Sequence, residues 1–212
     1  MSGASPAKTL RLGVLLSGRG SNFAAIAESV RKGALPGVEI AVVIANIEGA
    51  GGLEKARELG LKTELFVSKG RKRADHDRDV AACLKAHKVD LVILAGYMRL
   101  LSPEFIATFP NQILNIHPSL LPAFPGLDAQ TQAFDYGAKV AGCTVHFVDE
   151  ELDHGTIIVQ RVVPVLDEDD AHALAERILV EEHKAYTQAL QMVSSGEYEI
   201  AGRRYIKKSV KR

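Results

Sequence analysis

The strongest constraint on the fold is a regular alternation, over residues 10–117, of short apolar runs with segments of helical periodicity. The apolar runs have the length of buried strands, and apolar residues recur every three to four positions in the segments between them. Strands that alternate with helices pair in parallel through right-handed crossovers. We therefore expect an α/β fold with an open, mostly parallel twisted sheet and helices on both faces.

Turn residues and capping residues predict where these elements begin and end. Gly33 marks the end of the first helix. Ser102 followed by Pro103 is a typical helix start, and this helix stops before Pro110. The expected strands are residues 10–16, 38–46, 62–67, 90–96 and 112–117, and the expected helices are residues 23–33, 52–60, 73–88 and 102–110.

The pattern changes in the second part of the chain. Two long β-branched runs, residues 139–148 and 156–165, are separated by the acidic turn DEELDHG. They predict additional antiparallel or mixed strands. A helix is expected over residues 169–194, and the segment YEIAGRRYI indicates a short hairpin around Ala201 and Gly202.

Length and composition indicate one domain with a sizeable core. The chain has 212 residues, of which 47% are hydrophobic. We expect the domain to span residues 10–205, between a flexible leader (1–9) and a flexible basic tail (206–212). Lys and Arg together number 26, as do Asp and Glu, so no net charge attracts nucleic acid or an anionic membrane.

Targeting signals and cysteines add little. The N-terminal residues lack the apolar core of a signal peptide, and no window approaches the roughly 20 apolar residues of a membrane span. Cys83 and Cys143 have no second cysteine nearby, which argues against a disulfide framework or a cysteine zinc site. We expect a cytoplasmic protein that acts on small molecules, with both cysteines as small core residues.

A glycine-rich loop, SGRGSN at residues 17–22, joins the first strand to the first helix. Free backbone N–H groups and the helix dipole make such a turn suitable for an anion, so a phosphate could lie on Gly20, Ser21 and Asn22. Phe23 stands where a dinucleotide fingerprint has its third glycine, and no Lys-Ser/Thr pair makes a Walker A loop. The loop therefore indicates a single phosphate, or alternatively a tight turn with a serine or asparagine N-cap.

Asn115 and His117 end the strand at 112–117 and precede a proline-rich segment. Ligands of open parallel sheets bind beyond the carboxyl ends of the strands, and residues two apart on a strand share one side. An amide donor beside an imidazole can stabilise an oxyanion and move a proton, as acyl-type transfer through a tetrahedral intermediate requires. Pro118 and Pro122 would restrict the backbone that follows. The alternative is a surface histidine at a strand end.

The turn DEELDHG supplies several acidic side chains near this histidine. A carboxylate close to His117 would favour its charged form and make it a better acid, but spacing does not say which acid faces inward. A metal site would have to combine His117, His146, Asp153 and His154. No HExxH or other compact ligand spacing supports it, so we expect no metal.

The segment VILAGYMRLLSP, residues 92–103, leaves a strand and stays apolar through Leu101, apart from Arg99. Met98, Leu100 and Leu101 could line a pocket for a flat heterocycle. The alternative is that these side chains belong to the core.

Taken together, VLLSGRGSN, VILAGYMRLLSP, LNIHPSLLPAFPG and GCTVHFVDEELDHGTIIVQ resemble the folate-dependent formyltransferases, in order and over nearly the whole chain. The resemblance implies the Rossmann-like formyltransferase fold. Within the family, the phosphate loop and IHPSLLPAFPG look most like the branch that formylates glycinamide ribonucleotide in purine biosynthesis. That activity would use 10-formyltetrahydrofolate as co-substrate and no metal, in a monomer or homodimer that binds neither nucleic acid nor membrane.

Two alternatives stay open beside this activity. The Asn-x-His-x-Ser-Leu-Leu-Pro core is shared with tRNA formylases and formyltetrahydrofolate hydrolases, so hydrolysis or formylation of another acceptor is the first. A nonenzymatic mononucleotide-binding module that uses only the glycine loop is the second.

The resemblance also implies roles for individual residues. It divides the domain into a phosphate-binding half, residues 10–110, and a catalytic and folate-binding half, residues 111–205. Asp128 and Gln130 depart from the histidine that the family often has in a helix there. Arg71 competes with Arg73 for the role of folate-side arginine. The implied residues are Asn115, His117 and Asp153 for catalysis; Gly20, Ser21 and Asn22 for the substrate phosphate; Glu182 for its ribose; and Arg73, Met98, Arg99, Leu100, Leu101 and Asn115 for the folate.

Overall fold

The computed structural model describes residues 9–209. Most of the expected leader and the last residues of the expected tail lie outside this range. The chain divides into two compact units, Met1–Thr108 and Phe109–Arg212, and each is described by itself. The expectation of one domain over residues 10–205 stays a prediction.

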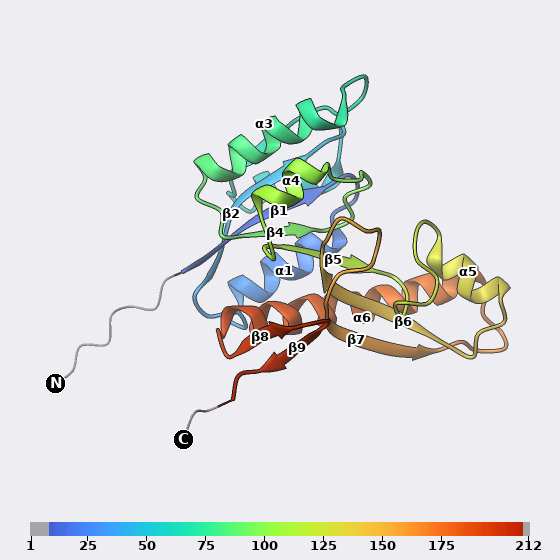
Figure 1. The fold of residues 1–212 in the computed structure, drawn as a ribbon. Coiled ribbons are helices and arrows are strands. Elements are labelled where there is room, and N and C mark those ends of the chain that lie inside the picture. The colour runs from blue at the N-terminus through green and yellow to red at the C-terminus, as the bar shows by residue number, and fades with distance from the viewer. Residues whose placement is uncertain (1–8, 210–212) are drawn as a thin grey trace. The chain divides into compact units, whose positions relative to one another are not determined.

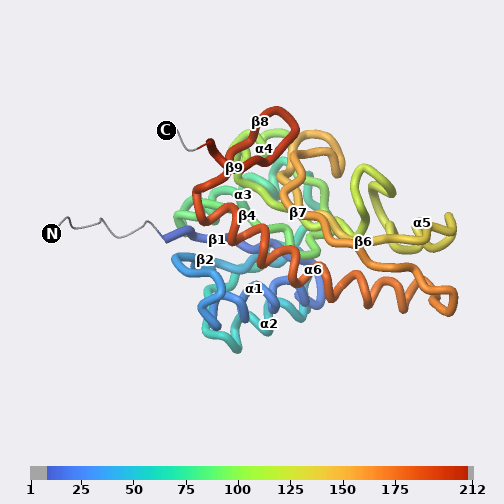
Figure 2. The backbone as a smooth tube through the Cα atoms, turned by 90° about the horizontal axis from the view of Figure 1, so that it is seen from below, coloured from blue at the N-terminus to red at the C-terminus, as the bar shows by residue number. Residues whose placement is uncertain are grey.

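The first unit is a parallel sheet with the strand order β3-β2-β1-β4. Helices α1 and α2 cover one face, and α3 and α4 cover the other (Figures 1 and 2). The expected alternation of strands and helices is confirmed. The elements are β1 (Leu10–Leu16), α1 (Ser21–Arg31), β2 (Val38–Ala45), α2 (Gly51–Glu58), β3 (Thr63–Leu65), α3 (Arg73–Ala86), β4 (Leu91–Leu94) and α4 (Pro103–Thr108).

Burial explains why the inner strands of this unit are almost continuously apolar. Strands β1, β2 and β4 have helices over both faces, so successive side chains on either side leave water. Leu12, Val43 and Ile93 are fully buried. Strand β3 is shorter than residues 62–67 because it is an edge strand that pairs only with β2.

The expected capping of α4 is confirmed. The Phe105 N–H donates to Ser102 Oγ at 3.3 Å, and Pro103 occupies the first helical position, where its missing N–H costs nothing. Cys83 departs from expectation, because it is partly exposed, whereas Cys143 in the second unit is fully buried. On α3 the residue after Cys83, Leu84, is the one whose side chain is fully buried.

The second unit has the strand order β5-β6-β7-β9-β8. The pairs β5–β6, β6–β7 and β8–β9 are antiparallel, and β7–β9 is parallel, so the mixed character expected for this part of the chain is confirmed. The elements are β5 (Ile113–His117), α5 (Ala129–Asp135), β6 (Val140–Phe147), β7 (Ile157–Pro164), α6 (Ala171–Ser194), β8 (Tyr198–Ala201) and β9 (Arg204–Lys207).

Helix α6 packs against β6 and β7 (Figure 1). Its start follows from Asp170, whose side chain accepts the Ala173 N–H at 2.7 Å. Leu174, Ile178 and Tyr186 lie on its buried face at helical spacing. Strand β9 runs to Lys207, so regular structure continues two residues beyond the expected domain end at 205.

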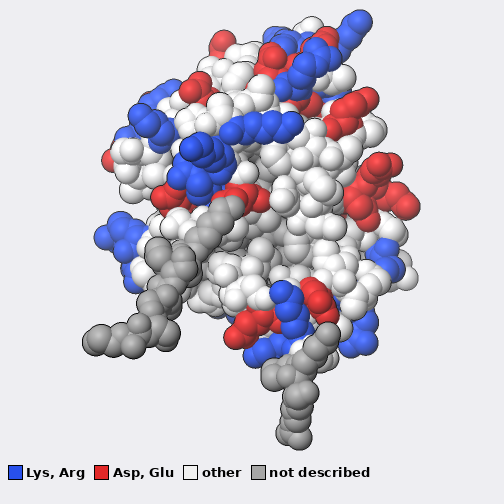
Figure 3. Space-filling view, turned by 60° about the vertical axis from the view of Figure 1, so that its left-hand side comes forward, with Lys and Arg blue, Asp and Glu red and all other residues white. Residues whose placement is uncertain are grey.

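Two surface properties complete the description. Among residues 9–209, no helix is both long and apolar enough to cross a membrane. The face drawn in Figure 3 carries basic and acidic side chains interspersed, in keeping with 26 residues of each sign.

Candidate active site

The glycine loop of the first unit has a backbone that only glycine accommodates well. Gly20 precedes α1 with a φ of 67°, and a Cβ placed on it would lie 2.5 Å from the Cα of Gly52. The N-cap position of α1 is therefore Gly20, and no described side chain caps the helix there. The alternative of a serine or asparagine N-cap is wrong, because Ser21 and Asn22 already lie within the helix.

Hydrogen bonds connect the carboxyl ends of three strands in this unit. Ser17 Oγ, just after β1, donates to Asn46 Oδ1 at 2.6 Å after β2, and accepts the Met98 N–H at 2.8 Å after β4. Asn46 Nδ2 in turn donates to Ser68 Oγ at 3.1 Å. The glycine loop and the segment at residues 96–101 are thus held together by a buried serine.

The segment at residues 96–101 presents apolar side chains to solvent. Met98 is 74% exposed and Leu100 is 55% exposed, so these two do not belong to the core. Its backbone is held at the far end, where the Ser102 N–H donates to Asp77 Oδ2 at 2.7 Å. Exposed apolar groups on a fixed backbone are typical of a ligand surface.

The two arginines at the start of α3 differ in their partners. Arg71 Nη2 donates to Asp79 Oδ2 at 2.7 Å, whereas Arg73 is exposed and makes no ion pair among residues 9–209. Arg99 contacts both the loop before α3 and α3 itself. Its Nη2 is 3.5 Å from the Arg71 backbone oxygen, and its Nε is 4.0 Å from Asp77 Oδ1. The guanidinium of Arg73 is therefore the more available of the two for an anionic ligand.

In the second unit, His117 lies at the end of β5 with its side chain 6% exposed. Its Nε2 is 2.8 Å from the Phe124 backbone oxygen, and its Nδ1 is 3.4 Å from Asp153 Oδ2. Both ring nitrogens therefore face oxygen acceptors. A neutral imidazole carries only one N–H, whereas the imidazolium can donate to both.

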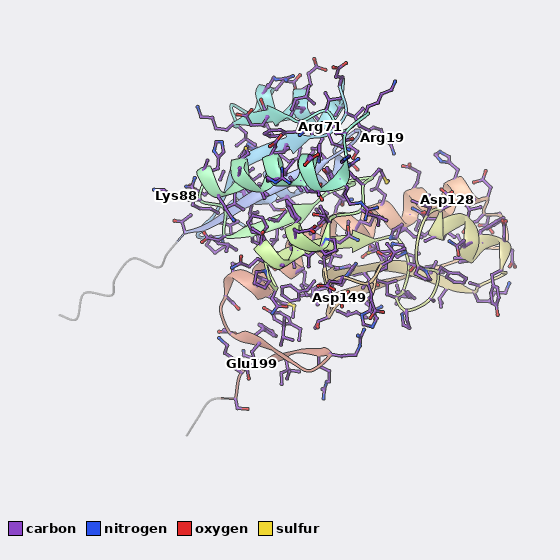
Figure 4. The ribbon with its side chains drawn as sticks, turned by 45° about the horizontal axis from the view of Figure 1, so that its top comes forward. Arg19, Arg71, Lys88, Asp128, Asp149 and Glu199 are labelled. Carbon is purple, nitrogen blue, oxygen red and sulfur yellow. The ribbon has the colours of Figure 1, made fainter. Side chains whose placement is uncertain are left out.

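Asp153 is the member of the acidic turn that reaches His117. Its φ of 52° is left-handed, and its Oδ2 accepts the Gly126 N–H at 2.8 Å. Asp149 instead lies 2.9 Å from His154 Nδ1, and the picture with side chains labels it at the start of this turn (Figure 4). Glu150 and Glu151 are exposed.

His146 joins this cluster from the neighbouring strand, where it pairs with Asn115 across β5 and β6. Its Nδ1 lies 2.7 Å from the Phe147 backbone oxygen, so Nδ1 carries the hydrogen and Nε2 is an acceptor. Asn115 Nδ2 lies 3.3 Å from that Nε2. Burial lowers the pKa of His146, which keeps it neutral and suited to hold the Asn115 amide in one orientation.

The arrangement combines an amide donor, an imidazole between two acceptors, and a buried carboxylate. These groups can stabilise a developing oxyanion and hold a proton beside it. The family model described as formyl transferase matches residues 10–190. The chain belongs to this formyl transferase family.

Individual relatives agree with this assignment. The phosphoribosylglycinamide formyltransferase of Escherichia coli (strain K12) is 39% identical over 184 residues, which cover 86% of each chain. The glycinamide ribonucleotide transformylase 1 structure from Symbiobacterium toebii is 47% identical, with a TM-score of 0.92 and coverage of 97% of this chain and 96% of that one. The trifunctional purine biosynthetic protein adenosine-3 of Drosophila melanogaster is 44% identical over 189 residues, but the match spans only 14% of its length.

Two residues that the sequence did not indicate, Thr144 on β6 and Gln160 on β7, hold the loop that follows His117. Thr144 Oγ1 accepts the Leu121 N–H at 3.0 Å and donates to the Ser119 backbone oxygen at 2.7 Å. Gln160 Nε2 donates to the Leu121 backbone oxygen at 2.9 Å. The Leu121–Pro122 bond is cis. The alternation of side chains along β6 and β7 is the only sequence signal that points Thr144 and Gln160 toward this loop.

Other residues expected from the resemblance lie on different elements. Glu182 is on α6 with a largely buried side chain. Asp128 is the N-cap of α5 with a φ of 55°, and Figure 4 labels it on a segment separate from Asp149. His154 turns toward Asp149 and Arg203, away from the cluster of His117, His146 and Asp153.

Proposed function

We propose that the chain transfers the formyl group of 10-formyltetrahydrofolate to the primary amine of glycinamide ribonucleotide. The match to the Escherichia coli relative named for this activity covers 86% of that protein and 86% of this chain. The two sequences compared are therefore of similar length. The observation that carries the chemistry is the placement of both His117 ring nitrogens against oxygen acceptors, one of them the Asp153 carboxylate. An imidazolium can donate a hydrogen bond to both acceptors, whereas a neutral ring can donate to only one.

The reaction needs charge stabilisation more than a strong base. The amine nitrogen attacks the formyl carbon, a C–N bond forms, and the carbonyl oxygen becomes an oxyanion. Asn115 and protonated His117 stabilise that oxyanion, while Asp153 stabilises the imidazolium. The bond between the formyl carbon and N10 of the folate then breaks, as a water carries the amine proton to N10. These steps call for neither a metal ion nor a covalent enzyme intermediate.

Residues of both units are proposed to bind the substrates. The N-terminus of α1 at Gly20, Ser21 and Asn22 would hold the single phosphate of the ribonucleotide. Glu182 would contact its ribose. The folate would lie against the side chains of Met98, Arg99, Leu100 and Leu101, with Arg73 nearby and Asn115 as a further contact.

The direct test supplies both substrates and follows tetrahydrofolate together with the formylated amine. Stoichiometric formation of the two products supports transfer. Tetrahydrofolate that forms equally fast without the amine would identify a hydrolase. Binding of a phosphate ligand that shows no dependence on folate, with no product, would identify a nucleotide-binding module.

A histidine variant tests the assignment of the site. His117→Ala should lose most of the turnover, about 10²–10⁴-fold, while the affinity for the phosphate-bearing substrate stays near normal. His172→Ala is a matched control, because His172 is exposed on α6. Near-normal turnover of His117→Ala would exclude the proposed role of that histidine.

A further inference from the structure

We propose that Arg203, at the tip of the β8–β9 hairpin, is a positioning residue that holds the turn bearing Asp153. Its guanidinium contacts the residue that directly follows Asp153. Nη2 donates to the His154 backbone oxygen at 2.6 Å, and Nη1 lies 2.8 Å from His154 Nε2. The match to the family model ends at residue 190, so Arg203 lies beyond it. The inference rests on the catalytic role proposed for Asp153.

The turn has a backbone that needs support from its surroundings. Asp153 adopts a φ of 52°, a left-handed conformation that is uncommon for residues other than glycine, although Asp adopts it more readily than most. The two ends of the turn lie close together, because a Cβ on Gly155 would be 1.9 Å from the Phe147 backbone oxygen. The Gly126 N–H holds the Asp153 carboxylate on one side. Arg203 holds the backbone on the other.

The charged groups around His154 make it a suitable acceptor for Arg203. His154 Nδ1 lies 2.9 Å from Asp149 Oδ2, so the ring donates from Nδ1 and leaves the Nε2 lone pair for the guanidinium. Glu151 Oε2 is 3.9 Å from the same Nε2. The Glu151 N–H donates to Asp149 Oδ1 at 3.1 Å. The turn and the guanidinium thus form one hydrogen-bonded network.

The hairpin that carries Arg203 is itself anchored to the strands on either side of the turn. Tyr205 packs edge-on against Phe147, the last residue of β6, with ring centroids 5.4 Å apart. Within the hairpin, Tyr198 stacks on Tyr205 with ring centroids 5.5 Å apart. Arg204 pairs with Ile157, the first residue of β7. Figure 1 shows β9 beside β7 in the second unit. The hairpin that carries Arg203 is therefore held in place by its contacts with β6 and β7.

A merely structural contact predicts different behaviour from a positioning contact. Arg203 is exposed, and exposed polar contacts contribute little to folding stability. Arg203→Ala should therefore change the melting temperature little. A displaced Asp153 would instead slow the chemical step, because small misplacements of catalytic groups are costly in rate.

The experiment is a double-mutant cycle with Arg203→Ala and Asp153→Asn in the full chain. We expect Arg203→Ala to lower the single-turnover rate of formyl transfer about tenfold, with substrate affinities unchanged. In the Asp153→Asn background, the same substitution should have no further effect, because the carboxylate that it positions is already gone. Arg203→Lys, which keeps the positive charge on a single donor nitrogen, should recover part of the rate. Arg204→Ala is the matched control, as an exposed arginine on the same hairpin.

Each failure has its own signature. An Arg203→Ala enzyme as fast as the wild type, with a slow Asp153→Asn enzyme, overturns the inference and leaves the proposed function intact. Equal losses from Arg203→Ala in both backgrounds would also overturn it, since Arg203 would then act independently of Asp153. A normal rate for Asp153→Asn contradicts the proposed catalytic role itself.

Discussion

Replacing Asp153 by asparagine is the sharpest test of how the site handles charge. The substitution keeps the size of the side chain, and the asparagine oxygen can still accept the Gly126 N–H that now binds Oδ2 at 2.8 Å. Because the same Oδ2 lies 3.4 Å from His117 Nδ1, the asparagine oxygen would also stay beside the His117 ring, and the amide nitrogen would replace Oδ1, which is 3.9 Å from His146 Nε2. The change therefore removes the negative charge beside His117 and leaves an oxygen acceptor in the same place.

The structure sets the size of the effect. At the observed 3.4 Å between His117 Nδ1 and Asp153 Oδ2, opposite unit charges attract by about 5 kcal/mol at an effective dielectric constant near 20. Each factor of ten in rate corresponds to about 1.4 kcal/mol, so the full attraction is worth about 10³–10⁴. Relaxation and entering water reduce this value. We expect kcat to fall about 10²–10⁴-fold, within the usual range of acid–base contributions.

The assay follows tetrahydrofolate formation with both substrates saturating, alongside binding of each substrate to the resting variant. Affinity should stay near the wild-type value because Asp153 acts on the developing charge. Asp167→Asn is the matched control, since Asp167 in the same unit is 95% exposed. A kcat within about threefold of the wild type would refute the reasoning, because it would mean that the carboxylate does not support His117 during turnover.

Three further predictions concern other parts of the chain. Burial lowers the pKa of His146 below 6.5, so the unfolded chain binds more protons than the folded chain as the pH falls. The contribution of a neutral His146 to the free energy of unfolding is therefore complete above about pH 6.5 and decreases below it. His146→Gln should remove this decrease, which is at most about 1.4 kcal/mol per pH unit, in urea melts between about pH 7 and 5. An equal pH slope in the variant would contradict this. In Gly20→Ala the backbone φ of 67° is unfavourable for alanine, and the new Cβ would lie 2.5 Å from the Gly52 Cα. The substitution should therefore lower the free energy of unfolding by about 2–4 kcal/mol and weaken ribonucleotide binding measured by calorimetry. Gly18→Ala, which has open space around its Cβ, should change neither quantity. Met98→Ser should leave the melting temperature unchanged, because the side chain is 74% exposed, yet weaken folate binding about tenfold, while Leu127→Ser, 78% exposed, should do neither.

Local patterns were enough to predict the type and order of most elements. The almost continuously apolar strands β1 and β4 need both faces covered, which is why they indicate a parallel sheet with helices on both sides. Ser102 and Pro103 specify the start of α4 through interactions that reach only a few residues along the chain. Residue spacing alone also indicated Asn115 and His117 as candidate catalytic residues at the end of a strand. Helix α5 was expected only through the family resemblance.

Other features depend on how distant segments meet. Spacing could not choose among the acids of DEELDHG, and the structure selects Asp153 because its left-handed backbone turns the carboxylate toward Gly126 and His117. His146 becomes a partner of Asn115 only through the antiparallel register of β5 and β6.

The sequence by itself determined the periodicities, the glycine loop and the family, because each of these is written in residues close together or in motifs that keep their order. The tertiary structure alone decided which polar groups share the site. Arg203 and His154 are 49 positions apart, and Asp153 and Gly126 are 27 apart. Contacts of that range depend on the register of paired strands and on the closure of turns, which no local preference encodes.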